Sequence, residues 1–167
     1  SDEEDGTYHA VKRLAQAGRC NIAFVNDDET ESEQHKLNGY RRAIQECGLP
    51  ERCYRAERSI EGGQFATTRI LRQDPRTDAI VFTEDTTAVG GLHTLLITGK
   101  RIPQDVAVIG CNNSVYCTIC YPQLSSIDNS LHETGRTAAQ QMIRLLNHEP
   151  DVEKTVCLPC RLVLRDT

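Results

Sequence analysis

Residues 99–129, GKRIPQDVAVIGCNNSVYCTICYPQLSSIDN, contain the clearest structural pattern in the chain. A glycine that ends a helix is followed by a proline turn and then by the apolar run Val106–Gly110, which has the composition of a buried parallel strand. A polar loop comes next, and the short segment Leu124–Ile127 is predicted to be extended. This order is typical of proteins in which helices and strands alternate.

Strands and helices are predicted to alternate along the rest of the chain as well. Short apolar runs predict strands at Cys20–Val25, Arg52–Ala56 and Asp78–Phe82, and a last strand covers about 155–164. Apolar residues at helical spacing predict helices that end near residues 16, 47, 72, 98 and 146. Right-handed crossovers then give an α/β protein with a Rossmann-like, mainly parallel sheet and helices on both faces.

Individual residues mark the predicted helix ends. Side chains that can accept a hydrogen bond from the first amides of a helix are predicted N-caps: Asp5, Ser59 and Asp85. Glycines just beyond the last turn are predicted stops: Gly18, Gly48 and Gly99. In the helix at about 61–72, the apolar contacts are expected from Phe65, Ile70 and Leu71.

The composition is that of a single globular domain with an ordinary core, with 38% hydrophobic and 26% charged residues in 167. The net charge is −5, whereas surfaces that bind DNA phosphates are normally basic, so this chain alone is not expected to bind DNA. No apolar run approaches the roughly 18 residues of a membrane span, and no signal-peptide pattern is present, so no membrane association is expected.

The eight cysteines include two pairs with CxxC spacing, Cys117/Cys120 and Cys157/Cys160, which resemble the knuckles of a four-thiolate zinc site. Cys157 and Cys160 fall in the predicted last strand, where residues three apart point to opposite faces. Buried, reduced thiols are therefore the favoured interpretation, and structural zinc or a redox role is the alternative.

Sequence patterns of an enzyme are missing from these residues. There is no phosphate-binding glycine loop, no nucleophile elbow and no histidine pair with metal-ligand spacing. The acidic runs at 2–5 and 27–31 do not have the spacing of a calcium loop and are interpreted as solvated charge. No enzymatic activity, cofactor or metal is therefore expected.

A ligand is expected at the carboxyl ends of the parallel strands, where sheets of this class bind small molecules. Three loops there are rich in side chains that donate or accept hydrogen bonds: Asn26–Gln34, Thr83–Asp85 and Cys111–Ser114.

Several motifs resemble those of the lac-repressor (LacI/GalR) family of transcriptional regulators. Asp85–Gly110, DTTAVGGLHTLLITGKRIPQDVAVIG, is similar to the pattern D-x-x-A-x-G-x-(helix)-G-x-x-[IV]-P-x-D-[VI]-x-[VI]-[IV]-G, and CNNS and YPQLSSIDN continue it. HKLNGYRRAIQECGL resembles the R-x-x-G-[FYW]-x-x-A-[LM] helix, and LPCRLVLRDT resembles the terminal strand. The resemblance covers nearly the whole chain and implies a periplasmic-binding-protein type I lobe, the C-terminal subdomain of an effector-binding domain.

The resemblance also implies a domain organisation. Residues of about 5–122 and 150–167 correspond to the second lobe, and 124–146 resembles an element of a first lobe that is otherwise missing. No helix-turn-helix headpiece is present, so operator DNA would be bound only through an absent N-terminal headpiece. The helix 132–146 would expose Ala138, Met142 and Leu145, and we expect this face to dock on another copy or on its own lobe.

Five residues stand at effector-contacting positions of the resembling motifs: Lys36, Arg58, Glu84, Asn112 and Asn129. Lys36 replaces the usual arginine, and Asn112 replaces an aspartate that accepts hydrogen bonds from sugar hydroxyls. Two added cations and one lost carboxylate favour an anionic effector such as a sugar phosphate, with Glu84 as the opposing charge.

The resemblance thus implies a cytoplasmic, allosteric regulator, a repressor-like homodimer that senses a sugar or sugar phosphate. Dimer contacts are expected from the helix 85–98, the loop 114–121 and residues 58–66. The alternative is an extracytoplasmic sugar-binding protein of a transport system, and an enzyme that uses the CxxC pairs is a more distant one.

Overall fold

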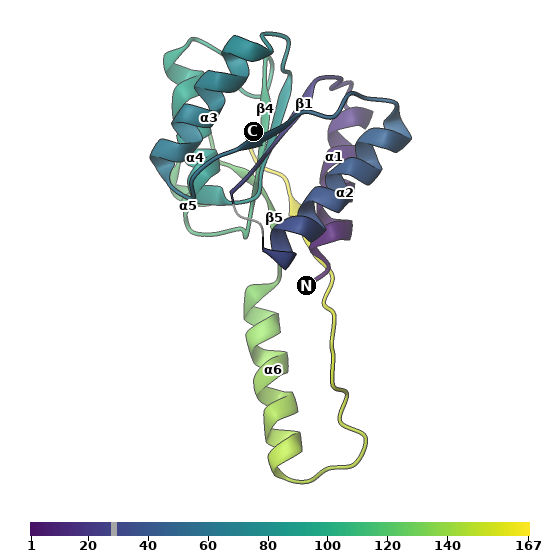
Figure 1. The fold of residues 1–167 in the computed structure, drawn as a ribbon. Coiled ribbons are helices and arrows are strands. Elements are labelled where there is room, and N and C mark those ends of the chain that lie inside the picture. Colours follow the sequence, from purple (N-terminus) through teal and green to yellow (C-terminus); the bar gives the residue numbers. More distant parts are fainter. Residues whose placement is uncertain (28–29) are drawn as a thin grey trace.

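The computed structural model describes residues 1–27 and 30–167. The helices are α1 (Glu3–Gln16), α2 (Glu31–Cys47), α3 (Ile60–Gln73), α4 (Asp85–Ile97), α5 (Tyr116–Ile119) and α6 (Leu131–Leu146). The strands are β1 (Ile22–Asn26), β2 (Cys53–Arg55), β3 (Ala79–Phe82), β4 (Ala107–Cys111), β5 (Ser125–Asp128) and β6 (Arg161–Val163). Figure 1 shows two parts, which we call the lobe (1–130 and 161–167) and the arm (131–160).

The lobe is built on one sheet with the strand order β2-β1-β3-β4-β5-β6. Strands β1 to β5 pair in parallel, and β6 is antiparallel to β5. The mainly parallel sheet predicted from the alternating pattern is therefore confirmed. Strands β1, β3 and β4 are buried along their whole length because helices cover both faces of the sheet.

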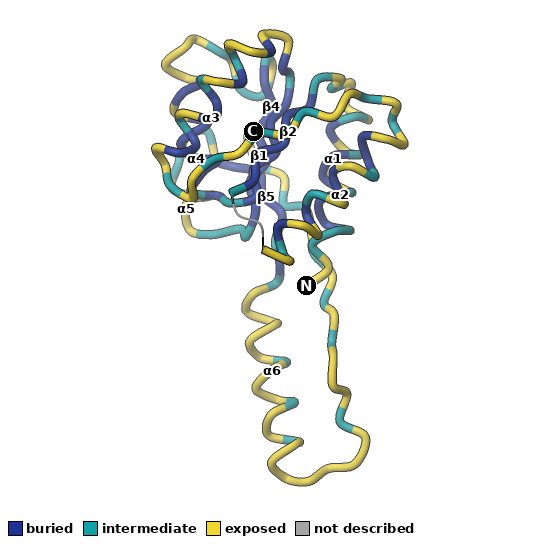
Figure 2. Tube along the Cα trace, viewed as in Figure 1, coloured by how far each residue is buried: buried dark blue, intermediate teal, exposed yellow. Residues whose placement is uncertain are grey.

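Two hydrophobic clusters lie on opposite faces of the sheet. The buried stretches of the strands and of the helices beside them are dark blue in Figure 2. One contains apolar side chains of α1 and α2, where Tyr40 is fully buried and stacks on Phe24 with ring centroids 4.8 Å apart. The other contains side chains of α3 and α4, including Ile70 and Leu95. Each helix pair thus shields one side of the strands from water.

Close helix packing explains the glycines of α3 and α4. A Cβ atom on Gly63 would collide with the carbonyl oxygen of Thr87, and one on Gly90 would collide with that of Ile60. The small residues on the facing sides of α3 and α4 therefore allow the backbones of these two helices to come into contact.

Most predicted helix ends are confirmed. Gly18, Gly48 and Gly99 all have positive φ angles, which glycine adopts at little cost. The Ser59 hydroxyl accepts a hydrogen bond from the amide of Gly62 at 2.9 Å, as an N-cap does.

Three expectations for the helices are wrong. Helix α1 begins two residues before Asp5, and Asp2 caps it by accepting from the amide of Asp5. Asp85 is the first residue of α4 and does not cap it; its carboxylate bonds to a neighbouring loop instead. Phe65 is 77% exposed, because it lies on the side of α3 that faces away from the sheet.

Two expectations for the last third of the chain are also wrong. Residues 124–128 do not leave the lobe, since β5 pairs with β4 and Leu124, Ser125 and Ser126 are fully buried. The last strand is limited to β6, and residues 155–160 run along the arm without pairing in the sheet.

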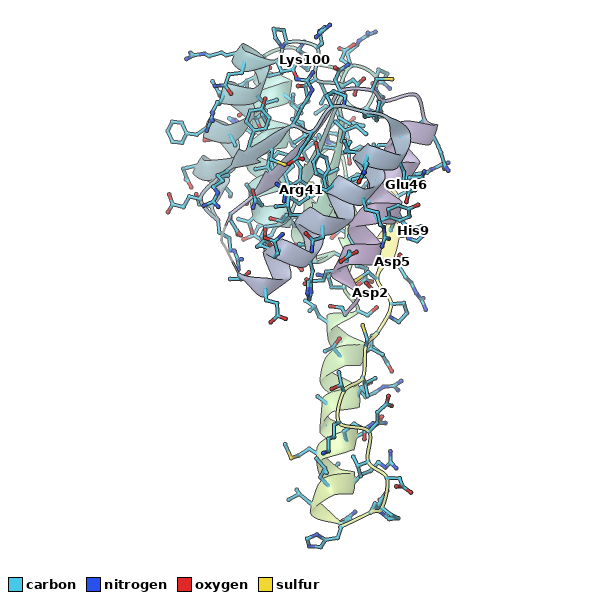
Figure 3. All side chains as sticks on the ribbon, turned by 45° about the vertical axis from the view of Figure 1, so that its right-hand side comes forward. Asp2, Asp5, His9, Arg41, Glu46 and Lys100 are labelled. Atoms are coloured by element: carbon cyan, nitrogen blue, oxygen red, sulfur yellow. The ribbon has the colours of Figure 1, made fainter. Side chains whose placement is uncertain are left out.

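The arm projects from the lobe (Figures 1 and 3). Helix α6 has no buried residue, and Met142, Ile143, Leu145 and Leu146 are all more than half exposed. Its contacts are with the return segment, where an apolar groove lies between Ala138, Leu145 and Val156. The expectation that this helix docks on its own lobe is therefore wrong, and docking on another copy stays a prediction.

Among the described residues, no helix combines the length and the apolar character that crossing a membrane requires.

Candidate functional site

All five residues predicted to contact an effector lie at the carboxyl edge of the sheet. Each follows a parallel strand: Lys36 stands in α2 after β1, Arg58 after β2, Glu84 after β3, Asn112 after β4 and Asn129 after β5. The three predicted polar loops meet at this edge, although residues 28 and 29 of the first loop lie outside the described residues.

A chain of side-chain hydrogen bonds joins three of these residues. The Asn112 amide nitrogen donates to Glu84 at 2.7 Å, and the Asn129 amide nitrogen donates to the Asn112 oxygen at 2.9 Å. Asn129 also donates to Glu3 at 3.1 Å. Asn112 has φ of 96°, a left-handed conformation that asparagine tolerates better than most residues and that often marks functional loops.

Lys36 is buried next to these hydrogen-bonded residues, and its ammonium group is already paired. Its ammonium donates to Glu33 at 2.8 Å and to the Thr83 carbonyl at 3.3 Å, and it lies 3.7 Å from Glu3. Burial opposes the charged form, but the interactions with Cys111, Glu33 and Glu3 together outweigh it and raise the pKa of Lys36. The ammonium is therefore committed to carboxylates of the protein itself.

Arg58 is the more accessible cation, with its side chain 53% exposed. It forms an ion pair with Asp27 that includes a hydrogen bond at 3.3 Å, and it lies 3.7 Å from Glu84. Burial raises the pKa of the Glu84 carboxyl, while the Arg58 and Lys36 charges act in the opposite direction. Glu84 thus lies between the Asn112 amide and the exposed guanidinium of Arg58.

Both predicted cations contact carboxylates of the chain. Lys36 contacts Glu33 and Glu3, and Arg58 contacts Asp27 and Glu84. The anionic effector was inferred from Lys36 and Arg58 as donors, and both are paired with carboxylates within the chain, so the anionic effector stays a prediction.

Sequence reasoning missed the residues that pair these cations. The signal was the two acidic runs, which were interpreted as solvated charge. Their residues Glu3 and Asp27 have side chains that are only 14% and 6% exposed. They reach the site because the start of α1 and the end of β1 lie at the same edge of the sheet.

Asp85 fixes the loop that carries Asn112. Its carboxylate accepts from the Ser114 amide and from the Ser126 hydroxyl, both at 2.7 Å. A Cβ on Gly110 would collide with the same carboxylate. The aspartate, glycine and serine of the family-like pattern therefore form one contact, which holds the β4 loop in place.

An open hollow of about 510 Å³ lies beside this loop, at the start of α6. Its lining includes the amide side chains of Asn112 and Asn113, the carboxylates of Asp128 and Glu133, and the imidazole of His132. These groups can accept and donate hydrogen bonds to a small polar molecule, and none of the lining residues is lysine or arginine.

The two CxxC pairs do not come together. Cys117 belongs to the cluster beneath α4, whereas Cys160 packs against the cluster on the opposite face of the sheet. In the part of the chain that the structure describes, no three His, Cys, Asp or Glu side chains form a group that could hold a metal. Burial raises the pKa of the Cys111 and Cys117 thiols to about 12.

Comparisons with known proteins agree with the fold. The family model of the periplasmic binding protein-like domain matches residues 11–167. The chain is 31% identical to catabolite control protein A of Priestia megaterium over 171 residues, which cover 99% of this chain and 52% of that protein. The chain spans about half the length of the curated relatives it matches.

Two solved structures are similar along 99% of this chain, each at 29% identity. One is a regulatory protein of the LacI family from Chloroflexus aggregans, with a TM-score of 0.92 and 61% of that chain covered. The other is a LacI family transcriptional regulator from Arthrobacter sp. FB24 in complex with lactose, with a TM-score of 0.88 and 64% of that chain covered.

Proposed function

The chain belongs to the family of periplasmic binding protein-like domains, and we propose that it is the effector-sensing part of a LacI-type transcriptional regulator. The observation that carries this proposal is the linked set Glu84, Asn112 and Asn129 at the carboxyl edge of the sheet, beside an open polar hollow. Such an edge is where α/β sheets bind small molecules. Its amide and carboxylate groups suit the hydroxyl groups of a sugar-like effector.

The finer prediction of a phosphorylated effector has less support than a hydroxyl-rich one. A phosphate needs donors that are not already engaged, whereas Lys36 and Arg58 each contact two carboxylates. We therefore propose that hydroxyl groups supply most contacts and keep the sugar phosphate as the alternative.

Regulation would follow from coupling between two lobes. We propose that α6, with Ala138, Met142 and Leu145, corresponds to a first-lobe element of the longer protein, and that the effector favours one arrangement of the lobes. A coupling free energy of about 1–3 kcal/mol would then change the affinity of a cytoplasmic dimer for operator DNA.

For the dimer we propose the surface formed by α3, α4 and α5, which lie together on one side of the lobe (Figure 1). Its exposed apolar side chains include Phe65, Ile97 and Ile119. Contiguous exposed apolar patches often mark protein contacts. Phe65→Ser would lower the dimer fraction measured by sedimentation. The unfolding temperature of the lobe, compared between samples that contain the same fraction of monomer, would not fall.

The test of effector sensing uses the full-length protein that contains this chain. Calorimetric titration with neutral sugars and their phosphates would identify a ligand. Asn112→Ala would weaken its binding by about tenfold, since the hydrogen bonds of the Asn112 amide to the ligand are lost. The matched control is Asn147→Ala, at the exposed end of α6. Equal loss in both variants would contradict the assigned site.

A DNA-binding measurement separates this function from its alternative. Retained sugar binding with no effect on any operator fragment would favour an extracytoplasmic sugar-binding protein of a transport system.

A further inference from the structure

The chain crosses twice between the lobe and the arm, and the two crossings lie side by side (Figure 1). It leaves the lobe after Ser130, which follows β5, and returns past Pro159 to β6. We call Ser130 and Pro159 the root of the arm; the Ser130 hydroxyl donates to the Pro159 carbonyl at 3.3 Å. Ser130 has φ of 52°, an uncommon conformation for a residue other than glycine. The root is therefore a turn that needs surrounding contacts to hold it.

The side chain of Asp128 connects this root to the loop of the candidate site. Asp128 is the last residue of β5. Its Oδ1 accepts from the Ser130 amide at 2.8 Å, and its Oδ2 accepts from the side-chain nitrogen of Asn113 at 3.3 Å. Asn113 directly follows Asn112 in the loop. One carboxylate therefore bonds both to the root of the arm and to the neighbour of Asn112.

Arg165 bonds to Asn113 from the other side. Its guanidinium donates to the side-chain oxygen of Asn113 at 2.7 Å and to the Leu124 carbonyl at 2.8 Å. Its backbone amide donates to the Ser125 hydroxyl at 2.9 Å, so its position is set by the sheet. A cation at the oxygen and a carboxylate at the nitrogen fix the orientation of the Asn113 amide, since the flipped amide would place donor against donor and acceptor against acceptor. Asn113 is therefore a bridge between Arg165 at the sheet and Asp128 at the root.

The contacts of Asn113 also affect Asn112. These two residues have φ of 48° and 96°, so two consecutive residues other than glycine are in the left-handed region. Such a conformation persists only where the surroundings hold it. Asn112 is the middle member of the hydrogen-bonded set with Glu84 and Asn129. A displacement of Asp128 would loosen Asn113 and let Asn112 move out of this set.

From this geometry we infer that Asn113, together with Arg165 and Asp128, is a positioning bridge that couples the orientation of the arm to the placement of Asn112. The inference rests on the proposed function and concerns the regulation of that same site. A change in the angle of the arm would reach Asn112 through Asp128 and Asn113. An effector that holds Asn112 would restrain the arm by the same route, because a coupling between two positions acts in both directions.

Hydrogen exchange in the effector-free, full-length protein measures the coupling at both ends of the bridge. Mass spectrometry follows two segments, 112–114 in the loop and 130–133 at the start of the arm. Asn113→Ala and Asp128→Ala are each expected to speed exchange about tenfold in both segments, because each removes the bond between the two side chains. The double variant is expected to exchange no faster than the faster single variant, since the two residues act through one contact.

An exchange of donor and acceptor tests the bridge without deleting a side chain. Asn113→Asp alone places a second carboxylate against Asp128 and is expected to speed exchange in both segments. Adding Asp128→Asn supplies an amide donor from the opposite side and is expected to restore both rates to within about twofold of the original. Asn147→Ala, at the exposed end of α6, is the matched control and is expected to change neither segment. Exchange in α3 checks that each variant is folded.

Sugar binding connects the bridge to the effector site. The full-length protein and the same variants are titrated with glucose, lactose and cellobiose. For a sugar that binds, Asn113→Ala is expected to lower the affinity about fivefold, and the swapped pair is expected to recover it. A loss that the swapped pair does not recover would show that Asn113 contacts the sugar itself, and would overturn its positioning role.

The remaining outcomes separate this inference from the proposed function. Exchange effects confined to the segment of each substitution, effects that multiply in the double variant, or no recovery in the swapped pair would overturn the bridge. Sugar affinity that depends on Asn112 and not on Asn113 would overturn the link to the effector and leave the effector site standing. Coupled exchange in a protein that binds none of the sugars would support the bridge and count against the effector site.

Discussion

Helices α4 and α6 have similar lengths, 13 and 16 residues, but opposite surroundings. Helix α4 lies between α3 and the sheet, and eight of its residues are buried. Helix α6 has a clear apolar side, yet none of its residues is buried and the arm stands clear of the lobe (Figures 2 and 3). An apolar stripe thus specifies which side of a helix needs cover, but another part of the fold has to supply that cover.

This contrast has a functional meaning under the proposed function. The lobe contains its own core and a preformed polar edge, so it supplies a rigid half of a ligand site. The arm has an apolar face that the described part of the lobe does not cover, as expected for an element that joins another lobe.

The largest expected difference between the two regions is in thiol reactivity. Cys117 is fully buried in the lobe, and burial raises the pKa of its thiol to about 12, whereas Cys157 is exposed in the arm. Iodoacetamide at pH 8 should therefore label Cys157 at least about a hundredfold faster, as followed by mass spectrometry. Adding denaturant should equalise the two rates, and equal rates in the native protein would contradict the buried position of Cys117.

A matched pair of leucines tests the same contrast by stability. Leu95→Ala removes a fully buried side chain of α4 and should lower the free energy of unfolding by about 2–5 kcal/mol. Leu145→Ala removes a side chain that is 55% exposed and should cost under about 1 kcal/mol. Urea unfolding of the isolated chain measures both. A large loss for Leu145→Ala would mean that α6 is covered in solution, by a second copy for example.

Two glycines sharpen the comparison at the backbone. Gly90→Ala would place a Cβ against the Ile60 carbonyl and should destabilise the lobe by about 1–3 kcal/mol. Gly135→Ala in α6 meets no atom within 4 Å and should instead raise helix stability by about 0.5–1 kcal/mol. Thermal unfolding followed by circular dichroism checks both signs. A stabilising effect of Gly90→Ala would show that α3 and α4 are not in close contact.

The smallest expected effect is a pH dependence in the lobe. Hydrogen bonds from Arg101 lower the pKa of Asp105 to about 2, below its value in an unfolded chain. The folded state therefore gains stability above about pH 4 and loses it as the pH falls toward 2. Asp105→Asn should lower the unfolding temperature slightly at pH 7 and not at pH 2.

The control for this prediction is Glu133→Gln in the arm, which should leave unfolding of the lobe unchanged at both pH values. An unchanged pH profile for Asp105→Asn would contradict the paired geometry.

The sequence predicted best those features in which one residue type has one role in its immediate surroundings, such as ending or capping a helix. The stops at Gly18, Gly48 and Gly99 and the cap at Ser59 were predictable because they depend on a few neighbouring backbone groups. Asp85 looked like a cap for the same reason. It is not one, because Ser114 and Ser126, distant in sequence, offer its carboxylate better-placed donors.

The candidate site likewise has features that local sequence predicts and features that it does not. The order of strands and loops was enough to predict that Glu84 and Asn112 would share one edge of the sheet, since carboxyl ends of parallel strands coincide. Asn129 was named only from the resemblance, in a segment expected to belong to another lobe. The partners of Lys36 and Arg58 could not be predicted. They come from the start of α1 and the end of β1, and only the packing of α1 beside α2 brings Glu3 within 3.7 Å of Lys36.

The sequence by itself determined the alternation of elements, the parallel sheet and the edge at which polar loops gather, because these follow from local periodicity and chain connectivity. The tertiary structure decided which carboxylates pair with Lys36 and Arg58 at that edge, the retention of β5 in the lobe and the exposure of α6. Each of these depends on distances between residues far apart in the chain, and both electrostatic interactions and burial change steeply with such distances.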